Sequence, residues 1–369
     1  MERRLWRSFD FLLLISIILI ISMGVALIYS ATISTEGSEP LSERSFFRQM
    51  TFAASGLLIA LFVSAVDYHL LESVQWLIYI AAVGMLVLVL VIGQPGFGAQ
   101  SWLSLRGGIQ PSELAKVLLI VFLAKYLADH EERMDDPRWL LFSAALVVPS
   151  LFLIYRQPDF GTALVLAGIW LGMVFAVGVR FLHLGLLGVG LAAAAPVLWL
   201  SLEDYMKQRL LVYINPASDV SGMSYNARQA LISIGSGGWF GKGLLRGTQS
   251  QLYFLRVRHT DYIFSVLCEE LGFVGALILL LLLLVLLWRI LRAASLARDA
   301  FGRLIACGVA TMIFAQSFVN IAVNVGILPV TGLTLPLVSY GGSSLWATLL
   351  GIGLVESVVM RHKKLEFGG

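Results

Sequence analysis

The chain has 369 residues, of which 58% are hydrophobic and only 13% are charged, with a formal net charge of +3. Soluble globular proteins carry roughly 25% charged residues, so this chain has too little polar surface to cover a water-soluble particle of its size. The composition excludes a disordered chain and a soluble multidomain enzyme. Two cysteines, Cys268 and Cys307, both within apolar segments, exclude a disulfide scaffold.

The apolar segments predict an all-α, polytopic integral membrane protein with about ten transmembrane helices. Each segment approaches the roughly 20 residues that cross a hydrocarbon core as a helix, and continuous apolar runs differ from the alternation of membrane β-strands. The first segment is too long for a signal-peptide core of about 7–15 residues and is therefore a retained span. The predicted spans are 9–30, 50–66, 75–93, 111–128, 139–155, 161–179, 181–200, 263–290, 302–325 and 341–360.

The distribution of Lys and Arg predicts that both termini are cytoplasmic. With the N-terminus inside, the basic clusters at 3–7, 125–138, 289–303 and 361–364 all lie on the inner side. An even number of spans then returns the C-terminus to the same side. Residues 1–369 are predicted to form a single integral membrane domain.

A large extracytoplasmic loop is predicted over 201–262, between the seventh and eighth spans. Long loops are weakly governed by the positive-inside bias, so the cations in this loop do not contradict the orientation. Two interpretations remain open: a solvated loop that contacts anionic headgroups, or a cradle for a phosphorylated substrate. The cations are Lys207, Arg209, Arg228, Lys242, Arg246, Arg256 and Arg258.

Charged residues inside apolar spans are costly and are functional candidates by default. In QPSELAK, Glu113 and Lys116 are three residues apart, so they share a helix face and can pair. The pair is either an internal lock between helices or part of a substrate site. Asp159 lies in the turn RQPDFGT and reaches Lys116 if the two helix ends adjoin. An Asp in a Pro/Gly turn is also an ordinary turn residue.

The outer loop contains the glycine-rich stretch ISIGSGGWFGKGLLRG. Glycines at 235–243 allow backbone N–H groups to approach an anion closely, and Lys242 lies among them. The spacing is not that of a Walker A loop. The stretch is therefore a candidate anion cradle without a nucleotide-binding signature.

Asp261 begins the eighth predicted span in RVRHTDYIF, flanked by Arg256, Arg258 and His259. One interpretation is a helix N-cap, supplied by Thr260 or Asp261, because Asp and Thr are preferred there. The other is a general base, which needs a pKa close to the working pH and therefore some desolvation. The sequence leaves both open.

The last loop, NVGILPVTGLTLPLVSYGGSS, is broken by proline and glycine yet is largely apolar. Irregular backbone of this kind must be packed in protein or line a cavity, because lipid offers no hydrogen-bond partners. Ser339 and Tyr340 give the loop a polar edge, and Asn320 and Asn324 precede it on one helix face.

Five motifs in order, QPSELAK, QPDFGT, SGG-x-x-GKG, HTDYIF-x-x-x-x-EELGF and LPVTG-x-x-LPLVSYGGSS, resemble the SEDS family of shape, elongation, division and sporulation proteins. The match extends over nearly the whole chain. Short tails and the RHTD wording resemble the RodA branch most, with the FtsW branch as the close paralogue.

The resemblance implies a peptidoglycan glycosyltransferase that polymerises lipid II on the outer face of the bacterial cytoplasmic membrane, for cell-wall elongation and rod shape. Asp261 falls on the family's catalytic aspartate. The expected substrate-binding residues are Glu113, Lys116, Asp159, Arg209, Lys242, Arg256, Arg258, His259 and Ser339.

The expected mechanism has Asp261 as the base that deprotonates the acceptor hydroxyl while cations stabilise the departing undecaprenyl diphosphate. A divalent cation, Mg²⁺ or Mn²⁺, is compatible with this chemistry. The sequence shows no metal-ligand spacing and no organic cofactor is expected. The expected partners are a class B penicillin-binding protein (a transpeptidase), other elongation proteins, and lipid II with the undecaprenyl-diphosphate-linked glycan; no nucleic acid is expected.

Two positions depart from the family pattern. Ser101 in GAQSW stands where a basic residue is usual, and Arg256 and Val257 replace a Pro-Glu pair before the aspartate motif. Three alternatives remain: a septal paralogue with the same activity, a lipid II flippase, and a scaffold that activates a transpeptidase.

Overall fold

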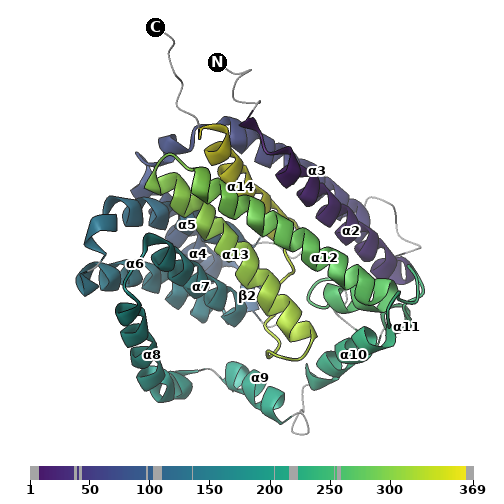
Figure 1. Cartoon of the computed structure of the whole chain (residues 1–369). Coiled ribbons are helices and arrows are strands. Elements are labelled where there is room, and N and C mark those ends of the chain that lie inside the picture. Colours follow the sequence, from purple (N-terminus) through teal and green to yellow (C-terminus); the bar gives the residue numbers. More distant parts are fainter. Residues whose placement is uncertain are drawn as a thin grey trace.

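The computed structural model describes residues 8–36, 40, 44–96, 99–102, 110–134, 136–202, 204–215, 223–252, 254–255 and 259–362. Long helices form a bundle, with the shorter helices of residues 204–251 at one end (Figure 1). The elements are α2 (Phe11–Glu36), α3 (Ser45–Ala65), η2 (Tyr68–Leu71), α4 (Gln75–Ile92), β1 (Gln94–Gly96), β2 (Ala99–Trp102), α5 (Pro111–Asp129), η3 (Glu131–Arg133), α6 (Pro137–Arg156), α7 (Phe160–Val177), α8 (Phe181–Ser201), α9 (Asp204–Ile214), α10 (Met223–Ser236), α11 (Thr248–Gln251), α12 (Ile263–Leu296), α13 (Ala300–Asn324) and α14 (Gly342–Met360).

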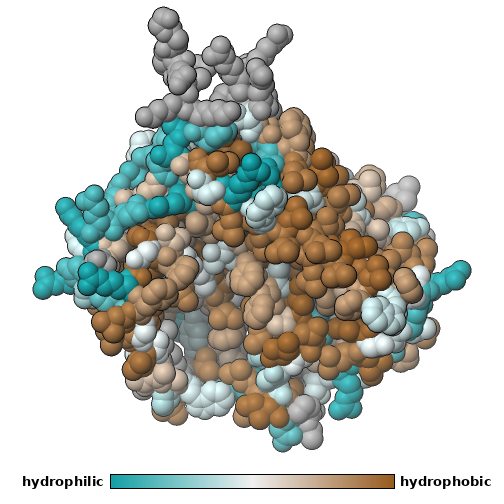
Figure 2. Space-filling view, in the orientation of Figure 1, coloured by the Kyte–Doolittle hydropathy of each residue, from teal (hydrophilic) through white to brown (hydrophobic). Residues whose placement is uncertain are grey.

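The predicted helical membrane architecture is confirmed. Each predicted span falls on a helix, and among the described residues 8 helices are long and apolar enough to cross a membrane. Apolar side chains dominate the visible face of the bundle (Figure 2). The remaining two predicted spans correspond to α5 and α8. Helix α5 carries several charges, and the apolar stretch described for α8, Phe181–Pro196, is shorter than the eight counted spans.

Three details differ from the sequence prediction. A short antiparallel hairpin, β1–β2, interrupts the all-α pattern between α4 and α5. The second helix begins at Ser45, five residues before the predicted start. Its first turns include polar residues, so the helix extends beyond the apolar segment from which the span was predicted. The eighth predicted span runs on to Leu296 and is bent at Gly272 (φ 66°, ψ −164°).

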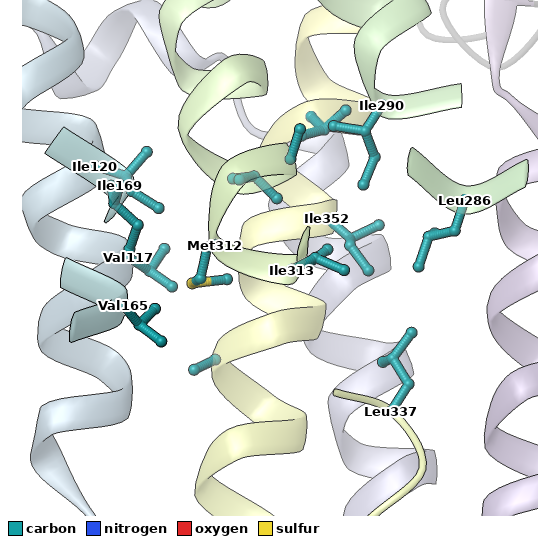
Figure 3. Packing of buried hydrophobic residues seen from close by; sticks show 14 of the residues in the cluster. Val117, Ile120, Val165, Ile169, Leu286, Ile290, Met312, Ile313, Leu337 and Ile352 are labelled. Atoms are coloured by element: carbon teal, nitrogen blue, oxygen red, sulfur yellow. The ribbon is translucent and has the colours of Figure 1, made fainter. Parts of the chain in front are cut away.

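The core lies among α5, α7, α12, α13 and α14. Side chains from these helices interdigitate, as shown for Val117, Ile120, Ile169, Met312 and Ile352 (Figure 3). Because other helices surround α5, its side chains are buried on all sides. Its polar residues are therefore inside the protein, which explains how a span with several charges is accommodated.

The beginning of α2 and the end of α14 lie at the same end of the bundle (Figure 1). There the Asp10 backbone N–H donates to Glu356 Oε1 at 2.6 Å. Arg289, near the end of α12, pairs with Asp10 at 2.5 Å. The start of α12, and with it Asp261, is consequently at the opposite end of the bundle, where α10 packs on α12. The single-domain organisation of 1–369 and the outer position of the 201–262 loop stay predictions.

Candidate active site

Asp261 lies in the turn that leads into α12, and α13 holds its backbone. The Asp261 carbonyl accepts hydrogen bonds from Nδ2 of Asn320 (3.0 Å) and of Asn324 (2.9 Å). The two asparagines are one helical turn apart, so they present both donors on one face, as the sequence spacing indicated. This clamp fixes the position of the residue without using its carboxylate.

The carboxylate of Asp261 does not cap α12. Tyr262 occupies the N-cap position and makes no side-chain cap bond. Asn324 Oδ1 instead accepts from the Ser265 backbone N–H at 3.1 Å and from the Ser265 hydroxyl at 2.6 Å. The N-cap interpretation of Thr260 or Asp261 is therefore wrong, because a neighbouring helix supplies the cap. The Asp261 carboxylate is left for another task.

Burial raises the pKa of Asp261 to about 6, against an ordinary value of 3.8. A side-chain hydrogen bond with Thr260 and the positive charge of Arg209 lower the pKa, whereas the negative charge of Asp159 raises it. Desolvation outweighs the two opposing effects. A carboxylate with this pKa is ionised at neutral pH and is a much better proton acceptor than an ordinary aspartate.

The last loop packs directly on the Asp261 turn. The Ser339 hydroxyl donates to the Thr260 carbonyl at 2.6 Å and accepts from the Leu335 N–H at 2.8 Å. The backbone N–H of Tyr340 donates to the carbonyl of His259 at 2.9 Å, and their rings meet edge to face. Ser339 and His259 thus support the Asp261 turn, and the Ser339 donor is occupied within the protein.

Asp159 lies beside the same site and caps α7. Its Oδ1 accepts from the Thr162 N–H at 3.0 Å, and its Oδ2 accepts from the Thr162 hydroxyl at 2.8 Å and from Gln110 Nε2 at 3.2 Å. Burial raises the pKa of Asp159, and the charges of Lys116 and Glu113 act on it in opposite directions. The helix ends of α5 and α7 therefore adjoin, as the sequence argument required.

Glu113 and Lys116 form a buried ion pair on α5, with Nζ and Oε1 2.8 Å apart. The Lys116 side chain has no solvent exposure and that of Glu113 is 5% exposed. A charge this deeply enclosed needs a partner, so removal of either residue alone would leave an uncompensated charge. The pair forms a fixed polar floor next to Asp159.

Arg209, on α9, brings positive charge to both aspartates. Burial lowers its pKa, and the charges of Asp261 and Asp159 act against that shift. Its Nη1 donates to the Val330 carbonyl at 3.2 Å, which ties α9 to the last loop. An apolar crevice adjoins the guanidinium, lined by Phe160, Leu202, Met206, Leu210, Pro329 and Val330.

The glycine-rich stretch is built against α12, not around an open anion site. Lys242 pairs with Glu269 at 2.8 Å, and the loop N–H groups of Lys242 and Gly243 donate to the carbonyls of Glu269 and Glu270. A Cβ on Gly241 would lie 2.1 Å from the Glu270 oxygen, so this glycine is needed for close packing at the Gly272 bend. The interpretation of the glycines as an anion cradle is not supported by these contacts.

The structure thus brings together Asp261, Arg209, Asp159, His259 and Ser339, with Glu113 and Lys116 behind Asp159. Lys242, in the loop after α10, pairs instead with Glu269 of α12. The predicted cations Arg256 and Arg258, and Val257, fall outside the described residues. Four further residues of the site carried no predicted role, although two of them stand within the quoted motifs and the other two share a visible helical spacing: Gln110, Thr162, Asn320 and Asn324.

Among the described residues, no group of three His, Cys, Asp or Glu side chains is placed to hold a metal ion. Both oxygens of Asp159 already accept hydrogen bonds within the protein.

The comparison with protein-family models gives one match over nearly the whole chain. The FtsW/RodA/SpoVE model, described as "Cell cycle protein", matches residues 10–364. The chain belongs to this family. The SEDS resemblance is thereby confirmed, and the proteins of known name that it resembles come from several branches of the family.

Among these relatives, the peptidoglycan glycosyltransferase MrdB of Escherichia coli is 41% identical over 326 residues, covering 86% of each chain. Stage V sporulation protein E of Bacillus subtilis is 39% identical over 363 residues, covering 95% of this chain and 96% of the relative. The probable peptidoglycan glycosyltransferase FtsW of Trichlorobacter lovleyi is 35% identical over 361 residues, 95% of this chain and 93% of the relative.

Solved structures share the fold. A chain from a peptidoglycan synthase complex, in a structure that concerns the coordination of polymerization and crosslinking, is similar with a TM-score of 0.80 and 33% identity, over 96% of this chain and 99% of that chain. The rod shape determining protein RodA of Thermus thermophilus is similar with a TM-score of 0.71 and 33% identity, over 97% and 99% of the two chains.

Proposed function

We propose that the chain is a peptidoglycan glycosyltransferase that polymerises lipid II, with Asp261 as the general base. Family membership and relatives named for this activity support the reaction class. The observation that carries the assignment to Asp261 is its carboxylate: it has a pKa of about 6 and is relieved of capping by Asn324. A structural aspartate at a helix start would be expected to cap the helix with its carboxylate, as Asp159 does for α7.

In the proposed reaction, the acceptor hydroxyl lies against the Asp261 carboxylate. Asp261 removes the hydroxyl proton as the oxygen attacks the anomeric carbon of the donor glycan, and the bond from that carbon to the undecaprenyl diphosphate breaks. Attack from the face opposite the diphosphate inverts the carbon, so no covalent sugar–enzyme adduct is formed. The proton rests on Asp261, and the electron pair leaves with the diphosphate.

Arg209 is the described cation best placed to stabilise the leaving diphosphate. It acts electrostatically on Asp261 and borders the apolar crevice, so a diphosphate near its guanidinium would have apolar surface beside it for an isoprenoid tail. Arg256 and Arg258 are proposed as further diphosphate contacts from the same loop. Lys242 is proposed to act indirectly, by holding the loop against α12 through its ion pair with Glu269.

Glu113, Lys116 and Asp159 are proposed to shape the polar wall that receives the sugar headgroups. Ser339 and His259 hold the Asp261 turn in place. A divalent ion, Mg²⁺ or Mn²⁺, is compatible with the charge of the diphosphate, but the described side chains offer no cage for it. No step of the proposed reaction passes through a metal ion.

The decisive experiment replaces Asp261 by Asn. Asn has nearly the same shape and cannot accept the proton at neutral pH, so the rate of glycan synthesis from labelled lipid II is expected to fall by about 10²–10⁴-fold. The matched control is Asp136→Asn: Asp136 caps α6 at an exposed site and Asn is an equally good cap, so polymerisation should be unchanged. A folded Asp261→Asn protein with near-normal polymerisation would show that Asp261 is not the base.

We further propose a role in cell-wall elongation at the cytoplasmic membrane, with both termini inside and Asp261 at the outer face. The similarity to MrdB and to a RodA structure supports this role, although FtsW and a sporulation protein are also relatives. Expression in Escherichia coli depleted of MrdB should restore rod shape. Rescue of an FtsW-depleted strain in its place would assign the chain to division.

The proposed partner is a class B penicillin-binding protein, because a similar chain is part of a peptidoglycan synthase complex. Co-purification of the chain with such a transpeptidase from the same genome, followed by assay of crosslinked product, tests this partnership. The assay also separates the enzyme from a flippase or a scaffold. Purified chain that elongates lipid II in detergent supports an enzyme, whereas lipid movement or partner binding without polymer would contradict it.

A further inference from the structure

A second cavity lies at the end of the bundle remote from Asp261, between the beginning of α2 and the ends of α12 and α14. Its volume is about 300 Å³. The charged and polar groups on its wall are Ser8, Asp10, Arg289, Arg292 and His362. We call it the α2–α12 cavity. Nothing in the proposed reaction uses it.

Among the described residues that line this cavity, two arginines face one carboxylate. Asp10 is neutralised within the wall, since its Oδ2 accepts from Arg289 and its Oδ1 accepts from the Leu13 N–H at 3.0 Å. Glu356 lies behind the wall and accepts from the Asp10 N–H. Arg292 is therefore the cation of the described wall that forms no ion pair with a described carboxylate, and His362 lines the same cavity.

Three side chains of the wall have donor groups that a ligand could use. The contact of Arg289 with Asp10 uses its Nε and Nη2, and Nη1 takes no part in this ion pair. Among the described residues, Arg292 forms no ion pair. The Nδ1 atom of His362 contacts the Val359 carbonyl at 2.6 Å, which leaves Nε2 for a second partner.

The apolar side of the cavity continues onto the surface of the bundle that would face lipid. Phe11 and Leu12, on its wall, are 63% and 44% exposed, and Leu296 is 39% exposed. Trp288 is 54% exposed, and Arg289 lies 5.3 Å from its ring, an aromatic–basic pairing typical of a membrane interface. Hydrophilic side chains gather at this end of the molecule (Figure 2).

We propose that the α2–α12 cavity binds the headgroup of an anionic phospholipid from the surrounding membrane. The lipid phosphate contacts Arg292, His362 and Arg289, and the acyl chains lie along Phe11 and Leu12. Basic pockets between helix ends are suited to such headgroups, because the phosphate is paired in the cavity while the tails remain in hydrocarbon. A free phosphate ion would use only the polar half of this surface.

The test measures thermal unfolding of the purified full-length chain in detergent, titrated with dioleoylphosphatidylglycerol. Comparison probes are dioleoylphosphatidylcholine and inorganic phosphate. We expect phosphatidylglycerol to raise the Tm with a saturable dependence, and Arg292→Gln with His362→Gln to raise the half-saturating concentration by about tenfold. The matched control is Arg298→Gln, which removes an exposed cation at the same end outside the cavity wall.

Three outcomes would overturn the lipid site: equal response to phosphatidylcholine, the full shift from inorganic phosphate alone, or an unchanged half-saturating concentration in the double variant. Arg292→Gln alone gives a second reading if the double variant fails to fold, with an expected increase of about fivefold. Lipid II polymerisation measured on the same samples keeps this inference separate from the proposed function, because lipid binding and polymerisation are expected to be lost independently.

Discussion

Asp159 and Asp261 lie at the same site in similar sequence contexts, yet only Asp159 caps the helix that follows it. Each precedes a long apolar helix and has a threonine nearby. Asp159 caps its own helix through Thr162 and has both carboxylate oxygens engaged. Asp261 is replaced as a cap by Asn324 of another helix. Comparison of the two shows that a carboxylate at a helix start becomes available for chemistry when a residue of another helix caps the helix in its place.

The largest effect expected from this comparison concerns stability at neutral pH. The folded pKa of Asp261 is raised, so its contribution to stability is complete below pH 3.8 and is lost as the pH rises through about 6. Asp261→Asn removes that loss, and the variant should exceed the parent by up to about 3 kcal/mol at pH 8, less where water reaches the carboxylate. At pH 3.5 the two proteins should unfold at the same temperature.

Thermal unfolding in detergent across this pH range measures the difference. A destabilised Asp261→Asn protein at pH 8 would contradict the view that the ionised carboxylate is held at a cost. It would return Asp261 to a structural role.

The next effect tests the residue that replaces Asp261 as the cap. Asn324→Ala removes the buried acceptor of the Ser265 N–H and a donor to the partly buried Asp261 carbonyl. We expect a loss of about 2 kcal/mol in unfolding free energy and a decrease in polymerisation from the displaced turn. Ser317→Ala, a buried polar residue on the same helix, is the control. An Asn324→Ala protein as stable as the parent would show that Asn324 does not replace Asp261 as the cap of α12.

Asp159→Ala should destabilise the chain by about 1 kcal/mol, the usual value of an N-cap. The same substitution at Asp261 should cause no loss through capping, because Tyr262 holds the N-cap position without a side-chain bond. Apparent Tm values of the two alanine variants at pH 5 measure this difference. Equal losses would mean that both aspartates are structural caps.

The smallest effect is a shift in the pH dependence of polymerisation. The rate should fall as the pH drops below about 6, when Asp261 becomes protonated. Arg209→Gln removes a charge that lowers the pKa of Asp261, so the midpoint of this fall should move to higher pH. Arg228→Gln, an exposed cation on α10, should leave the midpoint in place. A midpoint unaffected by Arg209→Gln would separate Arg209 from the base.

Much of the site was accessible from the sequence because its motifs are local. The three-residue spacing of Glu113 and Lys116 predicted their pairing, and the structure shows it. The single-face spacing of Asn320 and Asn324 was visible, but the carbonyl that they hold lies about sixty residues away in the chain. The glycines at 235–243 suggested an anion site, whereas in the structure Gly241 allows close packing against the bend at Gly272.

The sequence by itself determined the helical membrane class, the positions of the spans and the candidate aspartates. These properties follow from hydropathy summed over about 20 consecutive residues and from short-range periodicity. Only the tertiary structure decided which aspartate caps its helix, that Lys242 pairs with Glu269, and that the charge of Arg209 acts on Asp261. Desolvation and charge pairing depend on which helix ends meet in space, and no local pattern specifies that meeting.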